Sequence, residues 1–271
     1  MPSAAEKRAA FRRLHESGCF ALPNPWDVGS ARLLQGLGFK ALASTSSGMA
    51  WSKGLTDYEV SLEEALEHLA VLGAASDLPL NADFENGFAD DPEGVAANVR
   101  QALSAGVAGL SIEDTTRRPG KPLYETAEAV ARIKAAKAAI DADGTGAVLV
   151  GRAEGVLFGH MGMSETIDRL VAIAEAGADC LYAPGLKTAD DIAAAVKAVS
   201  PKPLNVLAGF APLTMAQYED LGVRRVSVGG SLAKAAYGGL VAAARQIKDE
   251  GRFDTMLAGV TGREISGLLK G

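Results

Sequence analysis

Two short acidic segments hold the residues best suited to chemistry. Asp83 and Glu85 lie in the segment 81–87, and Glu113 and Asp114 lie in the segment 111–114. Each segment follows a short apolar run that we interpret as a buried strand. Carboxylates at the carboxyl ends of neighbouring parallel strands converge on one mouth. Like charges in one cleft repel unless a cation or shared protons compensate. The pattern therefore favours a site for an oxygen-liganded cation such as Mg²⁺, and the alternative is that these side chains cap helices or lie in solvent.

An arginine and another carboxylate follow a later apolar run. Arg152 and Glu154 end the stretch 147–154, which also has the pattern of a buried strand. An arginine at this position can clamp a substrate carboxylate with two hydrogen bonds. Alternatively, it forms an ion pair with Glu113 or Glu154.

Small hydroxyl residues follow another apolar run, at 44–48. Ser44, Thr45, Ser46 and Ser47 precede a glycine, and such a segment can present hydroxyl and backbone N–H groups to an anion. A polar turn explains the same residues. Further along, Asp57 ends a loop-like segment, where it is either a mobile acid or base or the cap of a turn.

Eight βα units are needed to position these residues. Eight apolar segments predict strands, and amphipathic stretches between them predict helices. The strands are expected at 19–22, 41–44, 78–82, 109–113, 147–152, 180–182, 204–207 and 225–228. The helices are expected at 28–37, 61–75, 92–105, 126–139, 164–176, 189–198, 214–221 and 231–248, with a short tail helix at 264–269. This alternation predicts a (β/α)₈ TIM-type barrel over residues 1–271 as a single domain with a short helical tail.

Composition narrows the class of protein. The 271 residues are 48% hydrophobic, 22% charged and carry a formal net charge of −6, so we expect no nucleic-acid surface. We find no apolar run long enough to span a membrane and no apolar leader at the N-terminus. Two cysteines far apart in the chain, Cys19 and Cys180, indicate reduced thiols. We therefore expect a soluble cytoplasmic protein, and the three histidines have no spacing that suggests a zinc site.

Five motifs in register resemble one family. The segments 24–31, 44–48, 81–83, 112–114 and 151–154 are together similar to the isocitrate lyase / phosphoenolpyruvate mutase superfamily. The likeness extends from about residue 20 to residue 248. It implies a (β/α)₈ barrel whose eighth helix swaps onto a partner subunit, in a homo-oligomer that is a dimer of dimers. It also implies Mg²⁺ or Mn²⁺ and a small α-keto or 2-hydroxy acid that reacts through an enolate-like species.

The resemblance assigns roles to individual residues. Those expected at the metal are Asp83, Glu85 and Glu113. Those expected in catalysis are Asp57, Arg152 and Glu113. Those expected at the substrate are Trp26, Thr45, Ser46, Ser47, Asn81, Arg152 and Asn205.

Two departures from the family pattern bear on specificity. The first aspartate of the family's Asp-x-Asp pair is Asn81 in this chain, which brings no charge. The family's lyases carry a lid cysteine, whereas the segment 115–122 has neither cysteine nor histidine and instead contains Arg117, Arg118 and Lys121. Isocitrate lyase activity itself is therefore not expected.

These observations predict a metal-dependent carbon–carbon lyase or decarboxylase. Its substrate would be a small α-keto or 2-hydroxy (di)carboxylic acid, as in oxaloacetate decarboxylation or 2-methylisocitrate cleavage. One alternative is an enzyme that acts on a P–C bond, of the phosphonopyruvate mutase or hydrolase kind. Another is a keto-acid-binding protein without turnover, which the neutral Asn81 and the altered lid suggest.

Overall fold

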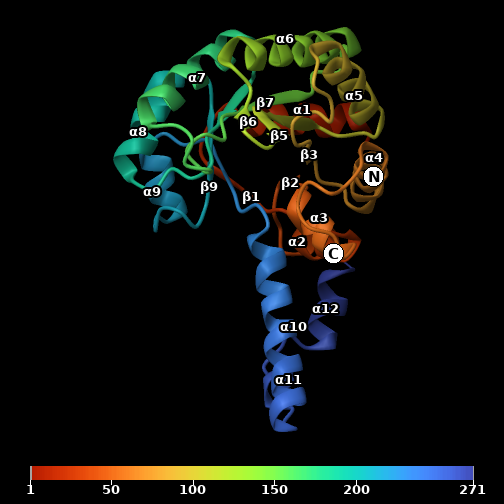
Figure 1. Ribbon diagram of the computed structural model, residues 1–271. Helices are drawn as coiled ribbons and strands as arrows, with labels where there is room; N and C mark the ends of the chain where they lie inside the picture. The colour runs from red at the N-terminus through yellow and green to blue at the C-terminus, as the bar shows by residue number, and fades with distance from the viewer. Residues whose placement is uncertain (1, 271) are drawn as a thin grey trace.

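Eight parallel strands form a nearly closed barrel in the computed structural model, which describes residues 2–270 (Figure 1). The order around the barrel is β1-β10-β9-β8-β7-β4-β3-β2. The two end strands approach each other where the Ala43 N–H donates to the Pro23 carbonyl at 3.0 Å. The barrel strands are β1 Phe20–Leu22, β2 Leu42–Ala43, β3 Leu80–Asp83, β4 Gly109–Glu113, β7 Val148–Arg152, β8 Cys180–Tyr182, β9 Leu204–Leu207 and β10 Arg225–Ser227. The predicted (β/α)₈ fold is confirmed.

Helices surround the barrel, and each predicted helix is present with ends shifted by a few residues. They are α2 Val28–Gly36, α4 Leu62–Ala75, α5 Pro92–Ser104, α6 Thr126–Asp143, α7 Met163–Glu175, α8 Ala189–Val199, α9 Met215–Asp220 and α10 Ser231–Glu250. A further helix, α1 Ala4–Leu14, places the buried Phe11 among barrel-interior side chains from β1, β7 and β8. No helix among residues 2–270 is long and apolar enough to cross a membrane.

Two segments that the sequence presents as loops are regular structure. The hydroxyl-rich segment continues into a short helix, α3 Ser46–Ser52, because Thr45 is its N-cap and accepts a hydrogen bond from the Gly48 N–H. The lid segment forms an antiparallel hairpin of β5 Thr115–Arg118 and β6 Lys121–Leu123. The hairpin turns through Gly120, whose φ of 81° favours glycine.

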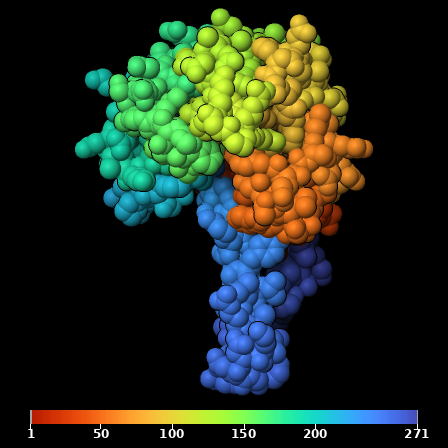
Figure 2. All heavy atoms as spheres, viewed as in Figure 1, coloured from red at the N-terminus to blue at the C-terminus, as the bar shows by residue number. Residues whose placement is uncertain are grey.

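The C-terminal helices leave the barrel. The long helix α10 projects as a stalk in Figures 1 and 2, and Ala233 is its one buried residue. The short helix α11 Asp254–Leu257 follows, and α12 Gly262–Leu268 returns to pack against α2. A side chain at Gly36 would clash with the Leu268 backbone, so this helix contact requires glycine at that position.

Candidate active site

A cavity of about 230 Å³ opens at the carboxyl ends of the barrel strands. Every barrel strand, or the segment directly after it, contributes to its wall. The polar residues of the wall are Asn24, Ser44, Thr45, Ser46, Ser47, Asp57, Tyr58, Asn81, Asp83, Ser111, Glu113, Arg152, Glu154, Tyr182, Arg225 and Ser227. In a (β/α)₈ barrel this end carries the chemistry.

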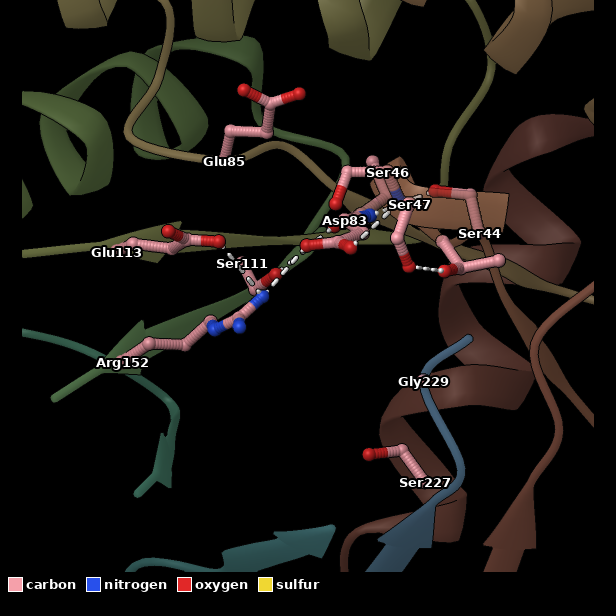
Figure 3. Close-up of polar contacts among 12 residues, drawn as sticks. Ser44, Ser46, Ser47, Asp83, Glu85, Ser111, Glu113, Arg152, Ser227 and Gly229 are labelled. Carbon is pink, nitrogen blue, oxygen red and sulfur yellow. Dashed lines mark hydrogen bonds and ion pairs between the residues drawn. The ribbon is translucent and has the colours of Figure 1, made fainter. Parts of the chain in front are cut away.

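Three carboxylates surround one arginine in the cavity, and Figure 3 shows two of them, Asp83 and Glu113, beside Arg152. Arg152 Nη1 lies 2.6 Å from Asp83 Oδ1 and 3.2 Å from Glu113 Oε1. Its Nε donates to Glu154 Oε1 at 2.7 Å. Strand register produces this grouping, since Glu113 and Arg152 are direct partners on β4 and β7. The ion-pair alternative for Arg152 is thus realised with both predicted partners and with Asp83 as well.

Burial shifts the pKa values of two of these carboxyl groups, Glu113 and Glu154. Desolvation raises the pKa of Glu113, although the charge on Arg152 opposes the shift. It raises the pKa of Glu154 to about 8, and Glu154 Oε2 has no hydrogen-bond partner among residues 2–270. Three carboxyl groups share one guanidinium, and those held in the protonated form can release a proton when a cation binds. The arrangement is suited to a cation or to proton transfer.

The start of α3 lies beside the charged group. The Ser46 N–H donates to Asp83 Oδ2 at 2.9 Å, and the Asp83 N–H donates to Ser44 Oγ at 2.8 Å. The Thr45 and Ser47 hydroxyls lie 3.2 Å apart. Hydroxyl and backbone donors therefore border the carboxylates.

A loop between α3 and α4 covers part of the cavity. Asp57 faces the cavity, and burial followed by the charge of Asp83 raises its pKa. The neighbouring Tyr58 donates its hydroxyl proton to Glu113 Oε2 at 3.1 Å. Sequence reasoning did not select Tyr58, because its contact depends on how the loop folds back.

The chain is similar to known proteins over most of its length. The family model of phosphoenolpyruvate phosphomutase matches residues 11–248. The chain belongs to this family. The predicted superfamily is therefore confirmed.

Three relatives of this family member show the range of the likeness. A solved structure from Burkholderia cenocepacia J2315, classed provisionally as a lyase or mutase, is 47% identical with a TM-score of 0.94, over 97% of this chain and 95% of that one. An oxaloacetate decarboxylase of Rhodopseudomonas palustris (strain BisB5) is 29% identical over 96% of this chain and 90% of its own. A phosphonopyruvate hydrolase solved with oxalate and Mg²⁺ is 28% identical with a TM-score of 0.85, over 97% of this chain and 95% of that one.

Several residues predicted for the family site lie off the cavity. Glu85 is paired with Arg117 and is turned away from Asp83 and Arg152 (Figure 3). Its left-handed φ of 46° follows the end of β3 and redirects the chain. Trp26 lies outside the wall and contacts Tyr237 of α10, with ring centroids 6.4 Å apart.

Other members of the predicted set have structural partners. Asn205 is fully buried, donates to Ser227 Oγ and accepts from Arg225 Nε. Asp114 points out of the barrel and pairs with Arg169 at 3.0 Å, since adjacent strand residues face opposite sides. Arg225 also lines the cavity, and none of the sequence motifs selected it.

Proposed function

We propose that this chain is a Mg²⁺- or Mn²⁺-dependent carbon–carbon lyase or decarboxylase. Its substrate would be a small α-keto or 2-hydroxy acid, and the reaction would pass through an enolate-like species. The observation that carries the proposal is the enclosed Arg152, with three carboxylates around it, beside the hydroxyl and N–H donors of α3. The likeness to an oxaloacetate decarboxylase supports the carbon–carbon chemistry.

The residues present fit a divalent cation. Asp83 and Glu113 would hold it, and the surplus of carboxylates over arginine supplies the compensating charge. Within the described chain, no three histidine, cysteine or carboxylate side chains gather as a closed metal site. Such a site would be completed by water and substrate oxygens, as is usual for Mg²⁺. When bound, the ion would stabilise negative charge that develops on an oxygen of the substrate. Glu85, engaged with Arg117, is not assigned to it.

The chain's own groups provide binding and proton transfer. The hydroxyl groups of Thr45, Ser46 and Ser47 would hold the substrate carboxylate. Asp57, with its raised pKa and buried Oδ1 that has no hydrogen-bond partner among the described residues, would hold or accept a proton. Arg152 would keep the carboxylates in place and stabilise negative charge that develops on the substrate in the transition state.

The proposal is tested by an NMR time course with Mg²⁺ and a substrate panel. The panel contains oxaloacetate, 2-methylisocitrate, 2,3-dimethylmalate and phosphonopyruvate. We expect cleavage of one of the three carbon acids, lost with EDTA and lost in Asp83→Ala, while the exposed control Asp220→Ala retains it. Turnover of phosphonopyruvate alone would instead establish P–C chemistry. Binding without turnover of any member would establish a keto-acid binder.

We also propose that α10 packs against a second copy of the chain, as in the helix-swapped oligomers that the resemblance implies. Its side chains Leu240, Val241 and Ile247 are exposed, and Leu240 is 63% exposed. Trp51 and Tyr237 line an apolar hollow at the base of the same helix. Exposed apolar surface of this extent on a projecting helix indicates an interface.

The free thiols of Cys19 and Cys180 support a reducing, cytoplasmic setting.

A further inference from the structure

Arg225 is a buried arginine with neutral partners. It is the first residue of β10, is 2% exposed and lines the cavity. Its Nε donates to Asn205 Oδ1 at 2.8 Å, and its Nη1 lies 3.4 Å from both Asn81 Oδ1 and His15 Nε2. Within residues 2–270, no carboxylate lies at ion-pair distance from Arg225, in contrast to the three around Arg152.

His15 does not supply a charge of either sign. Its Nδ1 donates to the Phe11 carbonyl at 2.8 Å, which leaves Nε2 as an acceptor for Arg225. Burial and then the charge on Arg225 lower the pKa of His15 to about 3. The imidazole is therefore neutral.

A buried guanidinium remains protonated and is costly without a counter-ion. Amide and imidazole acceptors satisfy hydrogen bonds but leave the positive charge uncompensated. Because Arg225 borders the cavity, an anion that enters the cavity can provide the missing negative charge.

The position of Arg225 relative to Arg152 and its carboxylates follows from β3. Asn81 and Asp83 are two residues apart, so their side chains face the same side of the strand, roughly 7 Å apart along it. Asp83 contacts Arg152, and Asn81 contacts Arg225. The Arg225 guanidinium thus lies about one side-chain layer below the carboxylate group. A short molecule can reach both layers.

We infer that Arg225 binds a second acidic group of the substrate, so that the site selects short dicarboxylates over monocarboxylates. This inference rests on the proposed function for the position of the first carboxylate near α3. Asn81 has a defined part in it. An aspartate there would neutralise Arg225 from within the protein, whereas the uncharged amide leaves the guanidinium available to a ligand.

The test is calorimetric binding of matched ligands with Mg²⁺ present. Malate and lactate differ by the second carboxylate, and 3-phosphonolactate carries a phosphonate instead. We expect the wild type to bind malate at least 10-fold more tightly than lactate. In Arg225→Gln this preference should fall below threefold, with lactate affinity changed less than twofold. An unchanged malate-to-lactate ratio in Arg225→Gln would overturn the inference. Dependence of 3-phosphonolactate binding on Arg225 supports the inference. The ligand that binds more tightly, malate or 3-phosphonolactate, then identifies the second acidic group as a carboxylate or a phosphonate.

A second variant remains informative should Arg225→Gln fail to fold. Asn81→Asp places a carboxylate beside Arg225, so we expect a higher Tm and a malate preference reduced at least fivefold. A higher Tm with an unchanged preference would show that Arg225 has a structural role only. Since binding is measured without turnover, failure of the proposed reaction leaves this test intact. Turnover with an Arg225-independent preference would refute the inference alone.

Discussion

At the scale of single residues, three carboxyl groups contact one guanidinium, that of Arg152, so acidic groups outnumber basic groups there. Burial favours the protonated forms of Glu113 and Glu154, and one guanidinium is shared between these two side chains and Asp83. Such a group is ready to bind a cation or exchange a proton. The same imbalance makes stability depend on pH.

Glu154→Gln should remove part of that pH dependence. Glu154 is fully buried, and its pKa is raised from 4.5 to about 8, so the folded state holds a proton that the unfolded state releases. The stabilisation is complete below pH 4.5 and is lost as the pH rises towards 8. Between pH 5.5 and 8, we expect the metal-free wild type to lose about 1–3 kcal/mol more unfolding free energy than Glu154→Gln.

Urea denaturation at several pH values, with EDTA, measures this difference. Glu165→Gln, on the exposed surface of α7, is the matched control and should follow the wild type. Parallel curves for the wild type and Glu154→Gln would show that Glu154 is ionised across this range.

Arg152→Lys should impair catalysis more than folding. A lysine has one charged nitrogen and cannot donate to Asp83, Glu113 and Glu154 in the geometry of the guanidinium. If the proposed function holds, kcat/KM should fall about 10²–10³-fold, the usual cost of a lost charge-stabilising donor. Steady-state kinetics on the substrate found by NMR tests this. Retention of more than a third of the activity would exclude a direct role for Arg152.

At the scale of elements, Arg117 of the hairpin β5–β6 contacts Tyr58 in the loop after α3. The Arg117 guanidinium lies 5.0 Å from the Tyr58 ring centroid and 5.1 Å from that of Phe88. It also pairs with the buried Glu85. Residues that the sequence presents as parts of a lid and a metal site therefore form a link between two loops at the cavity rim.

Arg117→Met should weaken the fold measurably. It leaves Glu85 buried without its counter-ion, and we expect a loss of roughly 2–3 kcal/mol of unfolding free energy, since Arg117 is partly exposed. Arg118→Met is the control. Arg118 pairs with Asp90 in solvent, so its replacement should lower the unfolding free energy far less than the replacement of Arg117.

Urea unfolding of Arg117→Met, Arg118→Met and the double variant Glu85→Gln/Arg117→Met measures the pair. The double variant should recover most of the loss, because no unpaired charge remains. Equal losses in the single and double variants would mean that ring stacking, and not the ion pair, provides the stability.

At the scale of the whole molecule, a barrel carries its chemistry at one end and an uncovered helix outside it. The helix α10 contributes one buried residue within the chain, Ala233. An apolar stalk of this kind is stable in water when another surface covers it.

Leu240→Asp should dissociate the assembly that we propose. A charge in the apolar face of α10 must be desolvated on association, at a cost of several kcal/mol. Sedimentation velocity should show an oligomer for the wild type and a smaller species for Leu240→Asp. The control Ala242→Asp introduces the same charge at an exposed position on the opposite side of the helix and should remain assembled. A monomeric wild type would contradict the interface.

Local patterns in the sequence were sufficient to predict the barrel and the cluster of carboxylates at its mouth. Each strand and helix has its own periodicity and end signals, and family resemblance reinforced them. Because residues at the carboxyl ends of parallel strands share one mouth, the positions of Asp83, Glu113 and Arg152 along the chain were enough to place them together.

The tertiary structure alone decided which side chains meet inside the barrel. A left-handed turn directs Glu85 to Arg117, and a folded-back loop brings Tyr58 to Glu113. The buried Arg225 meets partners from three distant parts of the chain. Such contacts depend on register, on closure of the barrel and on backbone turns at single residues. Short-range periodicity carries no information about them.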